Sequence, residues 1–125
     1  MADTFVVKLP VFGKPTIEPF DEKNTYKQLS EAVGGMIERA IIPAPLVKLP
    51  GCEIDCFVNE EGLLKGLPIN QRLTELCLKC YGDILVGNAI FVGHDGEGET
   101  IGLPKDVATA ILGLFDEELQ KKQRD

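Results

Sequence analysis

Four cysteines carry the most familiar metal chemistry in this chain. Cys52 precedes Cys56 by four positions and Cys77 precedes Cys80 by three, which approaches the ligand spacing of zinc sites. On one extended strand, however, Cys52 and Cys56 would lie about 13 Å apart, at ~3.3 Å per residue, too far to clasp one ion. We therefore predict structural thiols with no metal and no cofactor. A zinc site is the alternative, and a disulfide is not expected in a reducing compartment.

Nucleophilic catalysis would need a base beside a hydroxyl or thiol group, and the chain has one histidine and one serine. Ser30 falls inside a predicted helix, whereas His94 falls in a distant predicted loop. We interpret His94 as a loop residue that is charged below neutral pH beside Asp95. The sequence therefore predicts no catalytic residues.

A glycine-rich acidic segment runs from Gly93 to Gly102. Its alternating carboxylates, followed by Asp106, resemble a calcium-binding loop, but Thr100 stands where such a loop needs glycine. The last ligand would also be an aspartate instead of a bidentate glutamate. We favour a solvated acidic turn, with weak divalent-ion binding as the alternative. The secondary candidate residues are His94, Asp95, Glu97 and Glu99.

A second polar group is concentrated in the middle of the chain. Turn chemistry accounts for its members, because Gly62 suits a left-handed position and Asn70 suits a helix N-cap. The alternative is a polar binding surface in which paired carboxylates face Arg72 at the start of a helix. The candidate binding residues are Asn59, Glu60, Glu61, Gly62, Lys65, Asn70 and Arg72.

Strands must position these residues. Asn59 to Gly62 has the composition of a type I turn closed by Gly62 in the left-handed region, which would return the chain through Leu63 to Lys65 as a small hairpin. Pro15 and Pro19 predict a loop between them, and prolines within Pro43 to Pro50 exclude a central strand there. The predicted strands are Thr4 to Leu9, Met36 to Ile42, Ile54 to Val58 (half-buried) and Ile84 to Val92.

Three helices complete the prediction. In the first, Thr25 is a candidate N-cap, Gln28 completes a capping box, and Gly34 suits a left-handed C-terminal position. The second begins after Asn70, with Leu73, Leu76, Cys77 and Cys80 along its apolar side. Pro104 lies at the first turn of the last helix. The apolar stripe of that helix comprises Val107, Ile111, Leu114, Phe115 and Leu119.

Composition limits the class of protein. The chain has 125 residues, 44% apolar and 26% charged, which fits one soluble domain spanning residues 1–125. Its net charge of −7 disfavours direct nucleic-acid binding. Neither a membrane span nor a signal peptide is predicted, so we expect a cytoplasmic protein. We also expect its charged C-terminal end, residues 116–125, to fray. We predict an α/β (α+β) fold with a mixed sheet of four or five strands and three helices.

The segment from Phe57 to Asn70 carries a family resemblance. Its sequence, Phe-Val-Asn-Glu-Glu-Gly-Leu-Leu-Lys-Gly-Leu-Pro-Ile-Asn, lies between Val33-Gly34-Gly35-Met36-Ile37-Glu38 and Gly82-Asp83-Ile84-Leu85-Val86-Gly87. In order and spacing these segments resemble the family called domain of unknown function 3846, over about Tyr26 to Gly93. The resemblance implies an accessory protein of a phage, plasmid or virus, located in the host cytosol if viral, but implies no activity.

Two functions follow from these observations. The favoured one is a non-enzymatic interaction protein that binds an unidentified protein through the predicted hairpin from Asn59 to Lys65 and the adjoining helix end. The alternative is a small-ligand or nucleotide-binding domain, with or without catalytic activity, that uses Glu60, Glu61 and Arg72 with His94 or Asp95. A cavity lined by these groups would favour the second function.

Overall fold

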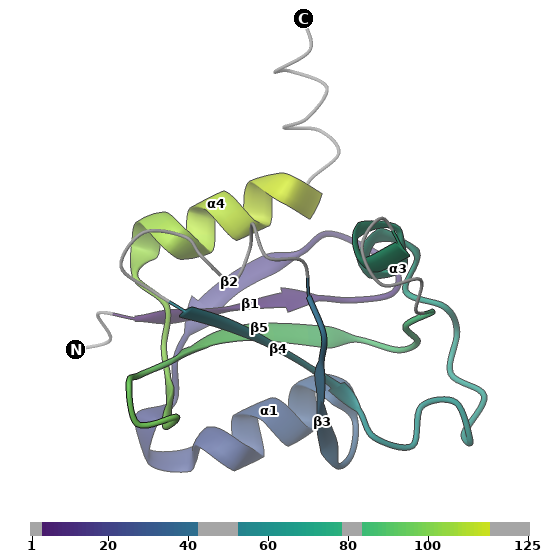
Figure 1. The fold of residues 1–125 in the computed structure, drawn as a ribbon, viewed down its shortest axis with the longest axis horizontal. Coiled ribbons are helices and arrows are strands. Elements are labelled where there is room, and N and C mark those ends of the chain that lie inside the picture. The colour runs from purple at the N-terminus through teal and green to yellow at the C-terminus, as the bar shows by residue number, and fades with distance from the viewer. Residues whose placement is uncertain (1–3, 43–52, 79–83, 116–125) are drawn as a thin grey trace, which may run out of the picture.

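An antiparallel sheet forms the centre of the molecule (Figure 1). The structure, a computed structural model, describes residues 4–42, 53–78 and 84–115. Within these ranges six strands run in the order β2-β1-β5-β4-β3, and β6 pairs with β5. The strands are β1 (Phe5–Leu9), β2 (Thr16–Pro19), β3 (Ile37–Ala40), β4 (Glu53–Asn59), β5 (Ala89–His94) and β6 (Thr100–Ile101).

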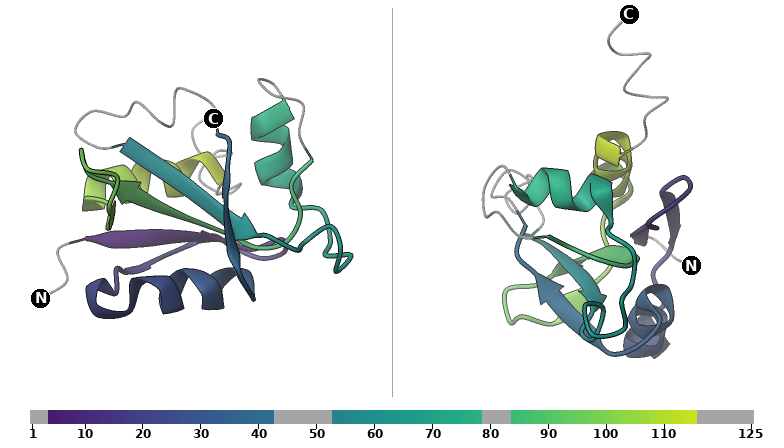
Figure 2. Two further views of the ribbon diagram at one scale, coloured as in Figure 1. Left: turned by 60° about the horizontal axis from the view of Figure 1, so that its bottom comes forward. Right: turned by 90° about the vertical axis from the view of Figure 1, so that its right-hand side faces the viewer.

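Helices cover both faces of the sheet (Figures 1 and 2). On one face lies α1 (Thr25–Val33), which follows the short 3-10 helix η1 (Glu22–Asn24). On the other face lie α3 (Gln71–Leu78) and α4 (Lys105–Phe115). The expected α+β fold with three helices on one sheet is therefore confirmed. The sheet differs from the prediction because every strand pair is antiparallel and six strands take part.

Alternate residues of the central strands enter two separate cores, as the pleat of a strand requires. Ile90 and Val92 of β5 pack toward α1, whereas Phe91 packs toward α4 and stacks on Phe115 with ring centroids 5.5 Å apart. Residues Ile54–Asn59 of β4 are all buried, in contrast to the half-buried strand that was predicted. Their burial follows from a layer of helix on each face of the sheet.

Two local predictions about strands are wrong. Thr16–Pro19 forms the edge strand β2 instead of a loop. Pro15 precedes this strand, and Pro19 is tolerated at its end because an outer edge needs no N–H donor. The hairpin after β4 is also absent from the described chain, since residues 60–66 form consecutive turns without a returning strand. Instead, β4 lies between β3 and β5.

The predicted N-cap of α1 at Thr25 is wrong, and the side-chain cap lies four residues earlier, at the start of η1. Thr25 is already helical, and the side chain of Asp21 accepts a hydrogen bond from the N–H of Asn24 at 3.1 Å. The predicted capping box between Thr25 and Gln28 is therefore absent, and the Gln28 side chain accepts instead from the N–H of Asp21 at 2.8 Å. At the other end, Gly34 has φ of 79° and lies in the left-handed region, as predicted.

One fully buried asparagine joins three segments of the chain. The Asn70 side chain caps α3 as predicted, by accepting from the N–H of Leu73 at 3.3 Å. Its amide N–H groups donate to the carbonyls of Leu9 at 3.2 Å and Gly87 at 3.0 Å. Its backbone N–H donates to the carbonyl of Leu85 at 2.8 Å. Asn70 therefore fixes α3 to the end of β1 and to the approach to β5.

We expect Asn70→Ala to lower the free energy of unfolding by about 2–4 kcal/mol, because two buried carbonyls would lose their donors. Asn70→Asp should destabilise at least as much, since a carboxylate oxygen would then face those carbonyls. Urea unfolding measures both changes. The control is Asn24→Ala, which removes an exposed side chain that makes no cap hydrogen bond and should shift stability by less than about 0.5 kcal/mol. Equal effects at the two positions would contradict the role given to Asn70.

Candidate functional site

The signature loop, residues 59–66, consists of the last residue of β4 and the turns that follow it, and it contains most of the predicted binding residues. Asn59 at its start is buried, and its side-chain amide donates to the carbonyl of Val33 at 3.1 Å. The side-chain oxygen of Asn59 accepts from the N–H of Glu61 at 2.8 Å. The N–H of Glu60 also donates to the carbonyl of Met36 at 2.8 Å. The signature loop is thereby attached to the end of α1 and the start of β3.

Hydrogen bonds within the backbone also hold the signature loop in shape. The N–H of Lys65 donates to the carbonyl of Glu61 at 2.9 Å, and the N–H of Leu67 donates to that of Gly62 at 3.0 Å. At the tip, Leu63 is 76% exposed and Leu64 is 90% exposed. The loop therefore holds two leucine side chains in water on an ordered backbone.

The predicted left-handed conformation of Gly62 is wrong. Gly66 occupies that region instead, with φ of +66°. Gly62 is required for another reason, since a Cβ built on it would lie 2.7 Å from Cγ2 of Val86 and 3.3 Å from the carbonyl oxygen of Asn59. Close packing of the loop against the bridge between Val86 and Ile69 explains this glycine.

We expect Gly62→Ala to destabilise the fold by about 1–3 kcal/mol through overpacking. In a Val86→Ala background the added methyl group has space, so the same change should cost clearly less. Gly66→Ala is the matched control, because its Cβ would meet no atom within 4 Å and its cost, about 1 kcal/mol of backbone strain, should not depend on Val86. Thermal unfolding of the double-mutant cycle measures this coupling, and purely additive effects of Gly62→Ala and Val86→Ala would refute it.

The structure separates the other predicted binding residues. Arg72 donates from Nη2 to the carbonyl of Pro10 at 2.7 Å and lines a pocket of about 580 Å³. Lys65 lines a neighbouring pocket of about 490 Å³. Glu60 and Glu61 are exposed and line neither pocket. Among the described residues no ion pair joins Arg72 to either glutamate, and the side chains of Asn59 and Asn70 are engaged in internal hydrogen bonds.

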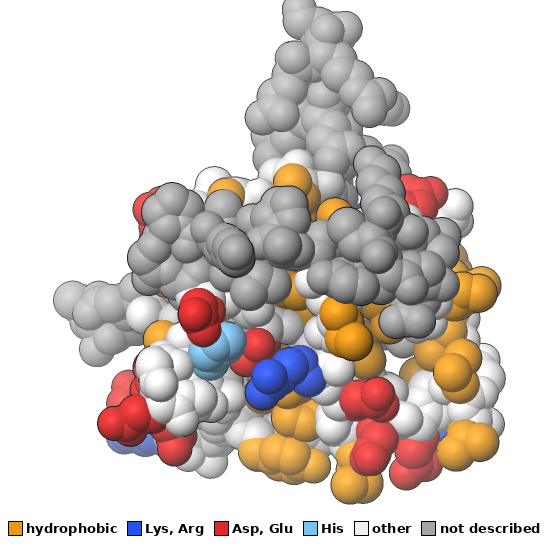
Figure 3. All heavy atoms as spheres, viewed as in Figure 1, with side chains coloured by type: hydrophobic (Ala, Val, Ile, Leu, Met, Phe, Trp, Pro, Cys, Tyr) orange, Lys and Arg blue, Asp and Glu red, His pale blue; other side chains and the backbone are white. Residues whose placement is uncertain are grey.

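A charged cluster that the sequence did not predict lies at one end of β4 and β5. His94 belongs to the end of β5, and its Nδ1 lies 3.0 Å from Oδ2 of Asp55 while its Nε2 contacts Glu53. Nε of Arg39 on β3 approaches Oδ1 of Asp55 at 3.9 Å. Figure 3 shows the histidine in pale blue between acidic side chains and close to a basic one. His94 therefore pairs with β4 and not with Asp95 as predicted.

Asp95 serves the turn between β5 and β6. Its Oδ1 accepts hydrogen bonds from the N–H groups of Glu97 at 2.9 Å and Glu99 at 3.0 Å. Its backbone N–H donates to the carbonyl of Glu99 at 3.0 Å. The secondary candidate residues therefore form a tight turn, and His94 points to other partners.

Cys56 is fully buried in the core on the α3 and α4 side, as expected of a structural thiol. Cys52, Cys80 and the side chain of Cys77 lie outside the described parts of the chain. Within those parts, no group of three or more histidine, cysteine or acidic side chains is arranged to hold a metal ion.

The amino-acid sequence matches one family model, described as "Domain of unknown function (DUF3846)", over residues 5–116. The chain belongs to the DUF3846 family. Comparisons with curated proteins and with solved structures find no match. None of the described helices of this DUF3846 domain has the length and apolar character that a membrane crossing requires.

The charge of His94 decides what the cluster in this DUF3846 domain can do. Partial burial lowers the pKa of His94, but the hydrogen bonds and charges of Asp55 and Glu53 outweigh it, so the pKa lies above its ordinary value of 6.5. With a carboxylate at each ring nitrogen, both nitrogens donate and the imidazolium is favoured. The ring then has no free nitrogen to act as a base, so the cluster joins β4 to β5 as an ion-pair network.

We expect this network to make stability depend on pH. Because folding raises the pKa of His94, its contribution is complete below about pH 6.5 and is lost as the pH rises through the raised value. Wild-type protein should therefore lose more stability between pH 6 and pH 8.5 than His94→Gln, by at most about 1.4 kcal/mol per pH unit. Urea unfolding at several pH values measures the difference. Parallel pH profiles for the two proteins would contradict the assignment.

Proposed function

We propose that this DUF3846 domain is a protein-interaction module that binds its partner through the signature loop and the adjoining start of α3. The observation that carries the proposal is the exposure of Leu63 and Leu64, at 76% and 90%, on a backbone held by its own hydrogen bonds. Exposed leucines cost solubility, and a preordered loop loses little entropy on binding. Both properties suit a recognition element.

The surroundings of the two leucines suggest the chemistry of the partner. Glu60 and Glu61 precede them and are exposed, and the chain has a net charge of −7. Ile69, 54% exposed, continues the apolar surface toward α3. The segment after β4 lies at the right of the molecule in the view of Figure 1, and in the same view Figure 3 shows hydrophobic side chains gathered on that side. The matching partner surface is an apolar groove with lysine or arginine residues along its rim.

Pocket geometry supports this function over the small-ligand alternative for the same residues. That alternative needs Glu60, Glu61 and Arg72 to line one cavity, together with His94 or Asp95. Of these, only Arg72 lines the pocket of about 580 Å³, and both nitrogens of His94 are engaged by carboxylates. The loop carboxylates are therefore better suited to the surface of a protein partner.

The experiment is comparative capture from the native host, followed by direct binding to the purified partner. We expect Leu63→Ser with Leu64→Ser to reduce capture at least tenfold, because each leucine buried in an interface contributes about 1.5–3 kcal/mol. Glu60→Gln with Glu61→Gln should weaken binding several-fold and make it less sensitive to salt. Thermal stability of both variants should stay close to wild type, since these side chains are exposed.

Two matched controls accompany these variants. Glu97→Gln with Glu99→Gln removes an exposed acidic pair elsewhere, and Tyr26→Ser removes a 57% exposed side chain on α1. Both controls should retain full binding to the purified partner. If the leucine variant binds as wild type does, or if the Glu97 and Glu99 control loses binding instead, the recognition surface lies elsewhere and the proposal fails.

A further inference from the structure

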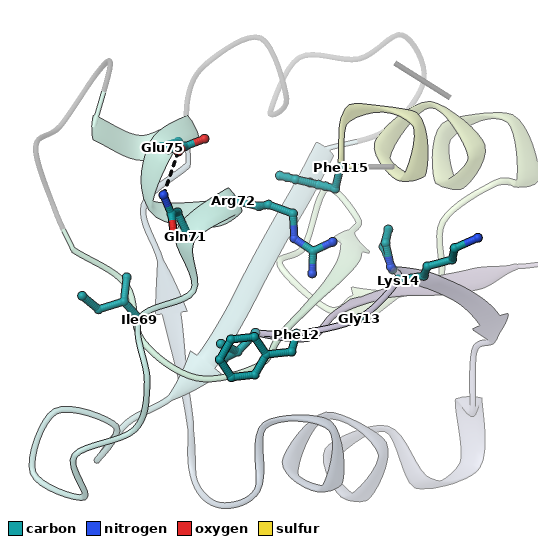
Figure 4. Close-up of a pocket in the computed structure, with 10 residues that line it drawn as sticks. Phe12, Gly13, Lys14, Ile69, Gln71, Arg72, Glu75 and Phe115 are labelled. Atoms are coloured by element: carbon teal, nitrogen blue, oxygen red, sulfur yellow. Dashed lines mark hydrogen bonds between the residues drawn. The ribbon is translucent and has the colours of Figure 1, made fainter. Parts of the chain in front are cut away.

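A pocket beside the β1–β2 turn has a lining that indicates the chemistry of its ligand. It has a volume of about 580 Å³ and lies between the β1–β2 turn, the first turns of α3 and the last residue of α4 (Figure 4). This volume falls in the range of small-molecule sites. The segments that line the pocket are far apart in sequence, so its shape depends on the tertiary fold.

Arg72 provides the cationic group of this pocket. Its side chain is half-buried, and one of its five N–H donors is taken by the carbonyl of Pro10 at 2.7 Å. Among the described residues no carboxylate lies within ion-pair distance of the guanidinium. Pro10 therefore orients a positive charge that has no anionic partner in the described fold. In Figure 4 the guanidinium points toward the β1–β2 turn.

Two other charged residues line the pocket. Lys14 on the β1–β2 turn also lines the pocket, with its side chain directed away from Arg72 (Figure 4). The acidic residue of the lining, Glu75, accepts a hydrogen bond from the Gln71 amide at 3.3 Å. Figure 4 shows the Arg72 guanidinium extending away from that pair, so Arg72 is the cation that an entering anion would meet.

Apolar groups line the remainder of the pocket. Phe12 at the tip of the turn is 80% exposed, and its ring lies beside the space in front of Arg72 (Figure 4). Ile69 and Phe115 extend the apolar wall on either side. An exposed aromatic ring next to an oriented guanidinium suits a flat body that carries a negative charge.

We propose that this pocket binds a small anion with a planar apolar body, in which a phosphate or carboxylate meets Arg72 and the ring packs on Phe12. The pocket shares Ile69 and the start of α3 with the proposed protein interface but uses neither the signature-loop leucines nor their glutamates, so variants at Phe12 and at Leu63 with Leu64 test the two proposals separately. Adenosine monophosphate and benzoate represent the two anionic groups on a flat body. Inorganic phosphate represents the anion without the ring.

The test is an NMR titration of the full chain with each of the three probes. We expect wild type to bind adenosine monophosphate or benzoate at least fivefold more tightly than inorganic phosphate, with shifts centred on residues 11–15 and 69–75. Tighter binding of adenosine monophosphate would identify a phosphate as the anionic group, and tighter binding of benzoate would identify a carboxylate. Arg72→Gln should weaken it at least tenfold, and Arg72→Lys should restore part of the loss. Phe12→Ser should weaken the ring compound several-fold without changing phosphate.

Controls separate this site from a general charge effect and from the signature loop. Lys27→Gln removes an exposed lysine on α1, and Leu63→Ser with Leu64→Ser alters the signature loop; neither should change probe binding. If Arg72→Gln does not fold, Arg72→Lys and Phe12→Ser decide the question, and both should weaken binding of the ring compound. Absence of binding by wild type at 10 mM probe, or binding that these variants leave unchanged, would overturn the proposal.

Discussion

The buried side chain of Asn70 is the contact on which the surrounding structure depends. An amide removed from water must have its hydrogen-bonding groups satisfied, and here the partners are a strand end, the bend before β5 and the first turn of α3. These contacts fix the direction of α3 over the sheet. They also set the distance between α3 and the β1–β2 turn, and so the width of the pocket in front of Arg72.

Asn59 has a parallel role at the other end of the signature segment. Both asparagines are buried and bind backbone carbonyls of distant segments, so the chain between them is anchored at each end. A loop anchored in this way can place leucines in solvent without losing its shape. The same segment therefore combines two internal polar anchors with an outward apolar tip.

Local signals in the sequence were sufficient for some of these features and not for others. The Asn70 cap, the left-handed Gly34 and the α+β class follow from neighbouring residues, and the structure agrees. The partners of His94 depend on the register of β4 against β5, because this register places His94 opposite Glu53. No local sequence pattern encodes the register of two strands. Likewise, the need for Gly62 arises from Val86, a residue distant in sequence.

The two outermost described strands have a consequence for self-association. On β2, Pro19 lacks a backbone donor, and on β3 the exposed side chains include Glu38 and Arg39. Both strands have four residues. Short edges with a missing donor or with charges oppose the addition of a strand from another molecule. Pairing of β2 or β3 with a strand of another copy is therefore disfavoured. Contacts between molecules are then expected to form through side chains instead of through backbone hydrogen bonds.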